Sequence, residues 1–405
     1  MAIRGSSAEL SGQMRLLLVN YEYPPVGAGA ATATQAIARN LVALGHHVTV
    51  LTGSFRNLPH RSDENGVTVL RVRCLRRRAD RCSVFEMFSF TVSALLSLPS
   101  VRVSAQPDAL IVFFSLPSGP IGAAAQFWYG LPYLVSLRGG DVPGLTPEVN
   151  WIQRLLAPIR RHILKRATAV VANSDGLRDL SEAADPIPVQ VIPNGVDTDF
   201  FRPSPESWVS AHERFRLIFV GRFHAQKNLA VLLEQLAALR EQRPGKFEIH
   251  LVGDGPLRTQ LKTKANNLGL SDDIVWHGWL QREELSKICR SCHCLVNPSL
   301  YEGMPNAVLE AMACAKPIVA SRVRGNDAVV QHGKTGFLFP LDDPASLRES
   351  LQALIDDPAR AEEMGHLGRE WVTRDFSWEK VAAAYIKLLE PDKTAQSVGD
   401  SRVGP

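Results

Sequence analysis

Short apolar runs alternate with longer segments that carry apolar residues at helical spacing, and this alternation predicts the elements of the fold. In the first half of the chain, the runs with the length and β-branched content of strands are 15–20, 47–52, 67–72, 109–115, 132–137, 169–174 and 189–193. The segments between them include 32–44, where Ile37, Leu41 and Leu44 lie on one helical face, and 148–166. Strands separated by helices are typical of a doubly wound parallel sheet.

The alternation starts again after the proline-containing segment 200–208. Here the runs that predict strands are 216–221, 247–253, 273–278, 293–299 and 317–321, and those that predict helices are 228–241, 256–268, 282–291, 306–315 and 344–357. A chain of 405 residues exceeds the usual size of one hydrophobic core. We therefore predict two Rossmann-like, doubly wound α/β domains, 14–195 and 214–372, joined by a linker at 196–213.

The composition indicates a globular protein, with 45% hydrophobic and 21% charged residues. Disorder is predicted only for the leader at 1–13 and the polar tail at 391–405. The net charge of +4 is too small to predict a nucleic-acid partner. The N-terminus lacks a long apolar region before a small-residue cleavage site, so we predict no secretory signal and expect a reducing, cytoplasmic location.

Six arginines lie within residues 71–81, RVRCLRRRADR, and the apolar segment 84–98 follows. One interpretation is a solvated strand end and loop, and the other is a patch that binds anionic lipid or an anionic acceptor. The apolar segment has 15 residues and contains Glu86, which makes it too short to span a bilayer. It is expected to be a buried helix or a helix that rests on the inner face of a membrane.

A cluster of cysteines and one histidine, KICRSCHCLVNPS, has a spacing known from zinc sites and c-type haem attachment. Its second half also has the pattern of a buried strand, which would place Cys292 and Cys294 on one face and His293 on the other. Cys289 would end the preceding helix. Because no second cysteine pair completes a zinc site, we predict buried core thiols and no metal, with zinc and haem as the alternatives.

Ligands of doubly wound sheets bind beyond the carboxyl ends of the strands, so the residues after each strand are the candidates for a site. Gly27 and Gly29 follow the first strand and let the backbone approach a ligand before the helix near Thr32. The dinucleotide fingerprint is incomplete, because its third glycine and the acidic residue after the second strand are missing. A nicotinamide-dependent dehydrogenase is therefore disfavoured.

In the second half, Arg222 and Lys227 follow the strand RLIFVG, five residues apart across a loop that opens a helix. Two cations beside a helix N-terminus suit a diphosphate, although either alone is usually a surface charge. Gly253 and Gly255 form a tight turn after the next strand and keep bulky side chains away from the same place. This pattern predicts phosphate binding.

The segment SLYEGMPNAVLEAM places two acids around the start of a helix, with Glu302 just past a strand and Glu310 eight residues later. Glu310 could accept two hydroxyl groups of a ribose, and Glu302 could accept those of a second sugar. Backbone amides at the helix start could bind a phosphate or sugar oxygen, and they belong to Gly303, Met304 and Asn306. Either acid alone is more simply a helix-terminal or surface carboxylate, but the set favours a site.

These motifs together resemble the family 4 retaining glycosyltransferases, the glycosyl transferases group 1, over about residues 14–390. The matching segments are VGRFHAQKN, LVGDGP, IPNGVDTDFF, GKTGFLF and EGMPNAVLE, the last with the Glu-x7-Glu motif of the family. The resemblance implies the GT-B fold, in which two Rossmann-like domains face each other across a cleft. The N-terminal domain would bind the acceptor, the C-terminal domain the nucleotide sugar, and a helix at 373–390 would cross back to the first domain.

The resemblance also implies roles for the candidate residues. Arg222 and Lys227 would neutralise the diphosphate of a nucleotide sugar, Glu310 would hold the ribose, and Glu302 would hold the donor sugar. The loop with Gly27 and Gly29 would face the diphosphate. The backbone near Trp276, His277 and Gly278 would touch the base.

Transfer would retain the anomeric configuration and would need no metal or other cofactor. The partners implied are a UDP- or GDP-sugar and a sugar or lipid-linked acceptor. A bacterial cell-surface polysaccharide, lipopolysaccharide or glycolipid pathway would use such a reaction.

The stretch SLRGGDVPG departs from many relatives, which carry a histidine there. Here Arg138 could pair with a phosphate or the acceptor, and Asp141 could take the acceptor proton or bind its hydroxyl group. The alternative is a turn stabilised by Asp141. Other activities of the same fold also stay open, namely a nucleotide-sugar hydrolase or epimerase and a sugar phosphorylase. A non-enzymatic binding subunit is a further alternative.

Overall fold

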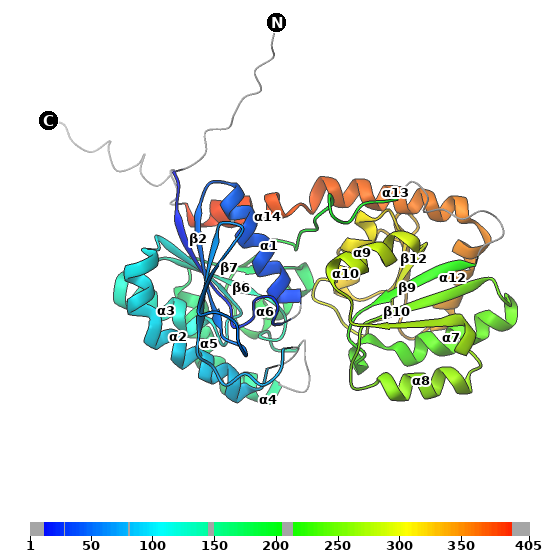
Figure 1. Cartoon of the computed structure of the whole chain (residues 1–405), viewed down its shortest axis with the longest axis horizontal. Helices are drawn as coiled ribbons and strands as arrows, with labels where there is room; N and C mark the ends of the chain where they lie inside the picture. The colour runs from blue at the N-terminus through cyan, green and yellow to red at the C-terminus, as the bar shows by residue number, and fades with distance from the viewer. Residues whose placement is uncertain (1–11, 28, 80–81, 145–149, 205–213, 391–405) are drawn as a thin grey trace, which may run out of the picture. The chain divides into compact units, whose positions relative to one another are not determined.

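The computed structural model describes residues 12–27, 29–79, 82–144, 150–204 and 214–390. The chain divides into two compact units (Figure 1). The first contains the residues up to Val171, Asp185–Gln190 and the residues from Ala382 on, and the second contains Ala172–Ala184 and Val191–Val381. The leader predicted to be disordered lies outside the described residues except for 12–13, and the predicted tail at 391–405 lies wholly outside them.

The first unit is built on a sheet with strand order β3-β4-β2-β1-β5-β6-β7-β8. Its strands are β1 Arg15–Val19, β2 His47–Gly53, β3 Arg61–Glu64, β4 Val67–Val72, β5 Ala109–Phe113, β6 Tyr133–Leu137, β7 Ala169–Ala172 and β8 Val189–Val191. Its main pairings are parallel, and β3 runs antiparallel to β4 at the edge. Edge strand β3, RSDE, was not predicted from the sequence, because four polar residues carry no strand pattern.

Along the chain, helices lie between the strands of this sheet: α1 Gly29–Ala43, α2 Val84–Ala105, α3 Gly119–Tyr129, α4 Asn150–Leu155, α5 Ala157–Arg166 and α6 Asp175–Ala184. Helix α6 belongs to the second unit. In Figure 1, α2, α3 and α5 lie side by side on one side of the sheet, and their contacts with one another agree. The single helix predicted over 148–166 is wrong. Its second part restarts as α5 with a proline in the first turn, because proline cannot donate the hydrogen bond that would continue α4.

The second unit has a wholly parallel sheet of order β11-β10-β9-β12-β13-β14. The strands are β9 Phe215–Val220, β10 Phe247–Val252, β11 Ile274–Gly278, β12 Cys294–Asn297, β13 Ile318–Ser321 and β14 Gly336–Phe339. The helices are η2 Ala225–Lys227, α7 Leu229–Gln242, α8 Arg258–Asn267, η3 Ser271–Asp273, α9 Arg282–Ser291, α10 Asn306–Ala313, α11 Arg324–Asp327, α12 Ala345–Asp356, α13 Pro358–Asp375 and α14 Trp378–Leu389. The doubly wound architecture predicted for this half is therefore confirmed.

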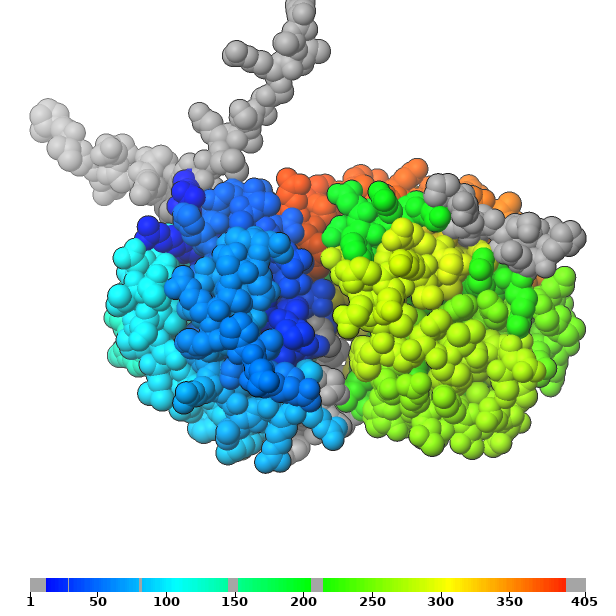
Figure 2. All heavy atoms as spheres, viewed as in Figure 1, coloured from blue at the N-terminus to red at the C-terminus, as the bar shows by residue number. Residues whose placement is uncertain are grey.

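Two hydrophobic clusters cover the two faces of the second sheet. One lies around Leu217, Phe219 and Leu236, and the other around Ile218, Leu309 and Met312. Neighbouring residues of β9 thus enter opposite clusters, as the alternation of side chains along a strand requires. Figure 2 shows the same view with all heavy atoms as spheres, and the spheres close the gaps that the ribbons of each unit leave in Figure 1.

The last helices run along the second unit and return to the first. Helix α13, which the sequence analysis did not predict, packs on α10, where Gly365 meets the backbone of Ala315. A Cβ atom at Gly365 would lie 2.1 Å from that carbonyl oxygen, so only glycine permits this approach. Helix α14 begins in the second unit, and its residues from Ala382 on belong to the first.

Candidate active site in the second unit

The carboxylate of Glu302 is held by three side chains at the carboxyl end of the second sheet. Lys227 Nζ lies 2.5 Å from Glu302 Oε1, and Ser299 Oγ donates to the same oxygen at 2.7 Å. Asn297 Nδ2 lies 3.4 Å away. The side chains of Glu302 and Lys227 are 7% and 19% exposed, so this ion pair is largely removed from water. Two residues that are 75 positions apart in the chain are brought together here.

The supporting residues of this network were not predicted from the sequence. Asn297 donates to Asn326 Oδ1 at 3.0 Å, and Asn326 in turn donates to the carbonyl group of Ser321 at 2.9 Å. Gly325 packs so closely that a Cβ atom there would lie 2.6 Å from the carbonyl oxygen of Glu302. The one sequence signal is the pair of polar residues, Asn297 and Ser299, that ends an otherwise apolar strand.

Arg222 lies two residues after the end of β9, and Lys227 ends the short helix η2 five residues later. The loops after β9 and β10 touch backbone to backbone. A Cβ atom at Gly253 would lie 1.9 Å from Gly221 O, and one at Gly255 would lie 2.4 Å from Phe223 O. Gly253 also has a φ of +130°, which favours glycine. The two glycines therefore let the β10 loop press against the β9 loop that carries both cations.

Glu310 lies in the middle of α10, with a partly buried side chain. Burial raises the pKa of this carboxyl group from 4.5 to about 7, and the nearby guanidinium group of Arg282 opposes the rise only in part. A carboxyl group with this pKa is partly protonated at neutral pH. Carboxyl groups with a strongly shifted pKa are common in functional sites, where they are retained for binding or catalysis although they lower stability.

The segment before α10 is tied to residues 192–197. Asn194 donates its backbone N–H to Met304 Sδ at 2.9 Å, and its side chain donates to Asn306 Oδ1 at 2.8 Å. These contacts engage the side chains of Met304 and Asn306, whereas the prediction concerned their backbone amides. Gly303 is more open, because the nearest atom to an added Cβ, Asn173 Oδ1, would lie 3.8 Å away.

The residues predicted to touch a base, Trp276 to Gly278, lie at the end of β11. Trp276 packs edge-on against Phe223 with ring centroids 5.8 Å apart, and His277 stacks on His250 at 5.1 Å. The carbonyl group of Gly278 accepts from the N–H of Gly253 at 2.8 Å. The first two side chains are thus engaged in packing, and the prediction for this segment concerns its backbone atoms.

In the first unit, the glycines after β1 have different surroundings. Gly27 has a φ of +99°, and a Cβ atom there would lie 2.7 Å from the Cβ atom of Glu22. Its N–H donates to the carbonyl group of Ala79 at 2.8 Å. Gly29 is the first residue of α1 and is exposed. Both lie at the carboxyl edge of the first sheet.

Asp141 is buried, and backbone amides surround its carboxylate. Ser115 N–H donates to Oδ2 at 2.6 Å, and the N–H groups of Arg138 and Gly139 donate to Oδ1 at 3.1 and 3.2 Å. Burial raises the pKa of Asp141, while these N–H donors favour its charged form. This geometry favours the alternative in which Asp141 stabilises the turn.

The guanidinium group of Arg138 is held by two aromatic residues in the same unit. Its Nη2 lies 3.2 Å from Tyr385 Oη, and its carbon lies 5.0 Å from the ring centroid of Phe113. Tyr385, in α14, also forms a hydrogen bond of 2.7 Å with Ser136 Oγ. Sequence reasoning did not find Tyr385, which lies 247 residues from Arg138.

The cysteine cluster belongs to the core of the second unit. Cys289, Cys292 and Cys294 are all buried, but the prediction that Cys292 and Cys294 share a face is wrong. Cys294 enters one hydrophobic cluster and Cys292 the other, because β12 begins only at Cys294. His293 Nδ1 accepts the N–H of Arg216 at 2.7 Å. Among the described residues, no group of three or more His, Cys, Asp or Glu side chains is arranged to hold a metal ion.

Two family models together match most of the chain. The model described as glycosyl transferase 4-like domain matches residues 28–195, and the model described as glycosyl transferases group 1 matches residues 214–357. The chain belongs to the family 4 glycosyltransferases. It is an enzyme of the GT-B fold that uses nucleotide sugars.

Full-length relatives agree with this assignment. A GDP-mannose-dependent alpha-(1-6)-phosphatidylinositol monomannoside mannosyltransferase of Mycobacterium tuberculosis is 25% identical over 94% of this chain and 100% of its own. An alpha-maltose-1-phosphate synthase of Mycolicibacterium smegmatis is 27% identical over 93% of this chain and 98% of its own.

Solved structures are similar to this glycosyltransferase in fold. A sucrose-phosphate synthase from Thermosynechococcus elongatus has a TM-score of 0.78 at 23% identity, over 96% of this chain and all of that one. HepE from Anabaena, solved in complex with UDP and glucose, has a TM-score of 0.72 at 19% identity, over 93% and 99% of the two chains.

Proposed function

We propose that this glycosyltransferase moves a sugar from a UDP- or GDP-sugar to an acceptor hydroxyl group with retention of anomeric configuration. The observation that carries the proposal is the Lys227–Glu302 ion pair at the carboxyl end of the second sheet. It joins a cation suited to a diphosphate with an acid suited to sugar hydroxyls. Glu310, in the helix that follows Glu302, is the proposed ribose ligand, and its pKa of about 7 supports a binding role.

In the proposed reaction, the bond between the anomeric carbon and the β-phosphate oxygen breaks, and the acceptor oxygen bonds to the same carbon. The acceptor proton passes to the departing phosphate oxygen. Negative charge grows on the nucleoside diphosphate as it leaves, and Arg222 and Lys227 stabilise that charge, so no metal ion or other cofactor is required. Glu302 orients the donor sugar, and the backbone of Gly27 and Gly29 faces the diphosphate.

The contacts of the segment SLRGGDVPG, residues 136–144, suggest its role. Arg138, fixed by Tyr385 and Phe113, presents a cation at the carboxyl edge of the first sheet. We assign it to contact with a phosphate or the acceptor. Asp141 acts as a positioning residue that holds the turn around Arg138, in place of the acceptor base considered from the sequence.

The acceptor proposed is a sugar or a lipid-linked sugar in bacterial glycolipid or cell-surface polysaccharide synthesis, at the cytoplasmic face of a membrane. Names of similar proteins support this class. One relative is named for a phosphatidylinositol monomannoside acceptor, and one structural neighbour, WaaG, is titled for lipopolysaccharide biosynthesis. Other relatives are named as a glycogen synthase and an alpha-maltose-1-phosphate synthase.

Calorimetric titration of UDP, GDP and ADP tests the site, with EDTA and with added magnesium, on the wild type and on Glu310→Ala. We expect one nucleotide to bind in the micromolar range, independently of metal and more weakly to the variant. If none of the three binds, the assignment of the nucleotide site fails. Turnover of a nucleotide sugar without an acceptor would instead favour a hydrolase or epimerase.

A further inference from the structure

Helix α2 exposes apolar side chains on the face that a surface helix normally fills with charge. Phe85, Phe88, Leu96 and Val103 are 66%, 63%, 78% and 77% exposed. We define the α2 stripe as these residues with two further exposed valines at one helical face: Val84, Phe85, Phe88, Val92, Leu96 and Val103. Amphipathic surface helices place apolar residues on the buried face alone, so this stripe requires another partner.

The opposite face of α2 is fixed to the first unit. Phe90, Ala94 and Leu98 are almost fully buried, and the helix packs on β2, β4 and α3. Among the described helices, α2 alone is long and apolar enough to cross a membrane. The sequence analysis considered only residues 84–98, which are too short to span a bilayer, whereas the helix continues to Ala105. The buried face argues against a membrane-spanning helix, because insertion into a bilayer would break the packing of Phe90, Ala94 and Leu98 on the first unit. The helix is instead suited to lie along a surface.

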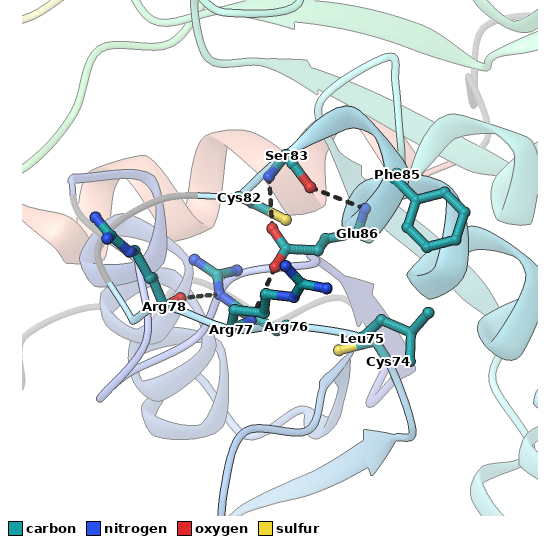
Figure 3. Close-up of a pocket in the computed structure, with 9 residues that line it drawn as sticks. All are labelled: Cys74, Leu75, Arg76, Arg77, Arg78, Cys82, Ser83, Phe85 and Glu86. Atoms are coloured by element: carbon teal, nitrogen blue, oxygen red, sulfur yellow. Dashed lines mark hydrogen bonds between the residues drawn. The ribbon is translucent and has the colours of Figure 1, made fainter.

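Glu86 does not interrupt the stripe. Its side chain is turned inward, where it accepts the N–H groups of Ser83 at 2.7 Å and Arg77 at 2.8 Å (Figure 3). Ser83 Oγ accepts the N–H of Glu86 in return, which completes a capping box at the start of α2. The backbone hydrogen bond from Ser83 is the main reason that the pKa of Glu86 is lowered. Its charge is therefore balanced within the helix terminus.

Cations stand at the same end of α2. We define the basic loop as residues 73–79, which precede the helix and contain the exposed arginines Arg73, Arg77 and Arg78. Arg76 differs from them, because it is held by Glu22 at 3.3 Å and by the carbonyl groups of Tyr21, Arg78 and Ala79. It therefore supports the loop and is not a free surface charge.

A pocket of about 810 Å³ joins the basic loop to the stripe (Figure 3). Cationic, apolar and thiol side chains line it together, among them Arg77, Arg78, Leu75, Phe85 and Cys82. A phospholipid offers phosphate oxygens for the arginines and acyl chains for the apolar side chains. The pocket is thus complementary to a lipid headgroup at an interface.

Aromatic residues are also exposed on the neighbouring helix. Phe127 and Trp128, at the end of α3, are largely exposed, and Tyr129 follows them. Helix α3 packs beside α2, and Thr91 Oγ1 in α2 donates to the carbonyl group of Pro117, two residues before α3 begins. Exposed tryptophan and tyrosine are typical of the membrane–water interface.

We propose that the α2 stripe and the basic loop dock the protein on an anionic phospholipid surface. The stripe lies in the interfacial region, and Arg73, Arg77 and Arg78 contact headgroup phosphates. The basic loop is hydrogen-bonded to the segment after β1, where the N–H of Gly27 donates to the carbonyl group of Ala79. Docking therefore brings membrane-borne acceptors to the carboxyl edge of the first sheet. This inference does not depend on the proposed donor site.

Vesicle co-sedimentation of the full chain tests the proposal, without donor or acceptor. The vesicles contain phosphatidylcholine with or without phosphatidylglycerol, at low and at physiological salt. We expect binding to the anionic vesicles. The triple variant Arg73→Ala/Arg77→Ala/Arg78→Ala should weaken it about 100-fold at low salt, from the usual contribution of each cation. The variant Phe85→Ser/Phe88→Ser/Leu96→Ser should weaken it more than about tenfold at both salt concentrations.

Matched control variants change the same number of exposed cationic and exposed apolar residues on the second unit. They replace exposed cations with Lys246→Ala/Lys287→Ala/Lys334→Ala, and exposed apolar residues with Val275→Ser/Trp279→Ser/Leu341→Ser. Both should bind vesicles like the wild type. Thermal unfolding and nucleotide calorimetry of every variant separate a loss of docking from a loss of folding or of the donor site.

Hydrogen exchange locates the contact. Vesicles should protect peptides from the basic loop and from α2, and should leave α8 unchanged. Absence of binding to anionic vesicles, equal losses in the control variants, or protection confined to other segments would each overturn the proposal. So would self-association in analytical ultracentrifugation that Phe88→Ser abolishes, without vesicle binding, because a second copy would then cover the stripe.

Discussion

Replacing Glu310 by glutamine should make the protein more stable while weakening its binding of nucleotide. Burial raises the pKa of this carboxyl group from 4.5 to about 7 in the folded protein. Between these values the unfolded chain loses the proton first, so ionisation favours unfolding and stability falls as the pH rises. The rise in pKa corresponds to about 3 kcal/mol above pH 7, since a tenfold change in proton binding is worth about 1.4 kcal/mol.

Glutamine fills the same space and has no proton to lose, so the stability difference between variant and wild type should be pH-dependent. It should be small near pH 4.5 and should grow in favour of Glu310→Gln up to about pH 8. For a unit of this size, about 3 kcal/mol corresponds to a rise in Tm of about 6–12 °C relative to wild type.

Thermal unfolding of both proteins across this pH range provides the assay, with calorimetric nucleotide titration beside it. Glu283→Gln, which changes an exposed carboxyl group on α9, controls for the loss of one negative charge. The reasoning is refuted if the Tm difference between Glu310→Gln and wild type is the same at pH 5 and pH 8. A stabilised variant that binds nucleotide as tightly as wild type would support the raised pKa of Glu310 but would contradict its role as a ribose ligand.

Three further predictions follow from single contacts. Lys227→Ala should lower turnover about tenfold or more through lost charge stabilisation, and normal steady-state kinetics would remove its assigned role. Gly253→Ala should destabilise the protein by about 2 kcal/mol or more, because the new Cβ atom would lie 1.9 Å from Gly221 O. Urea denaturation measures this loss. The control Gly245→Ala, with φ +67° and open space around it, should lower the free energy of unfolding by less. Asp141→Asn should lower Tm by leaving a backbone N–H without its carboxylate partner; lost turnover at unchanged Tm would instead restore the acceptor-base role.

The candidate site was predictable where its chemistry follows a strand in the sequence. Glu302, Lys227 and Gly253 each follow the carboxyl end of a β-strand, and such ends meet at one edge of a parallel sheet. Asn326 carries no comparable signal. It becomes part of the network only because the neighbouring strands β12 and β13 bring the residues that follow them together.

The helix at 84–105 illustrates the opposite limit. Its sequence is apolar all around, and its hydrophobic pattern alone does not distinguish a buried helix from one on a membrane. Only the packing of Phe90, Ala94 and Leu98 against the sheet defines the buried face, and with it the exposed stripe. The same holds for Cys292 and Cys294, whose faces depend on where β12 begins.

The sequence by itself determined the α/β alternation, the two Rossmann-like halves and the motifs of a glycosyltransferase, because these depend on local periodicity and on residues a few positions apart. The tertiary structure alone decided which distant residues meet, such as Lys227 with Glu302 and Arg138 with Tyr385. It also decided which acids are buried, and so the raised pKa of Glu310. The physical reason is that desolvation and ion pairing depend on distances in space, which strand order and packing set and which spacing along the chain does not contain.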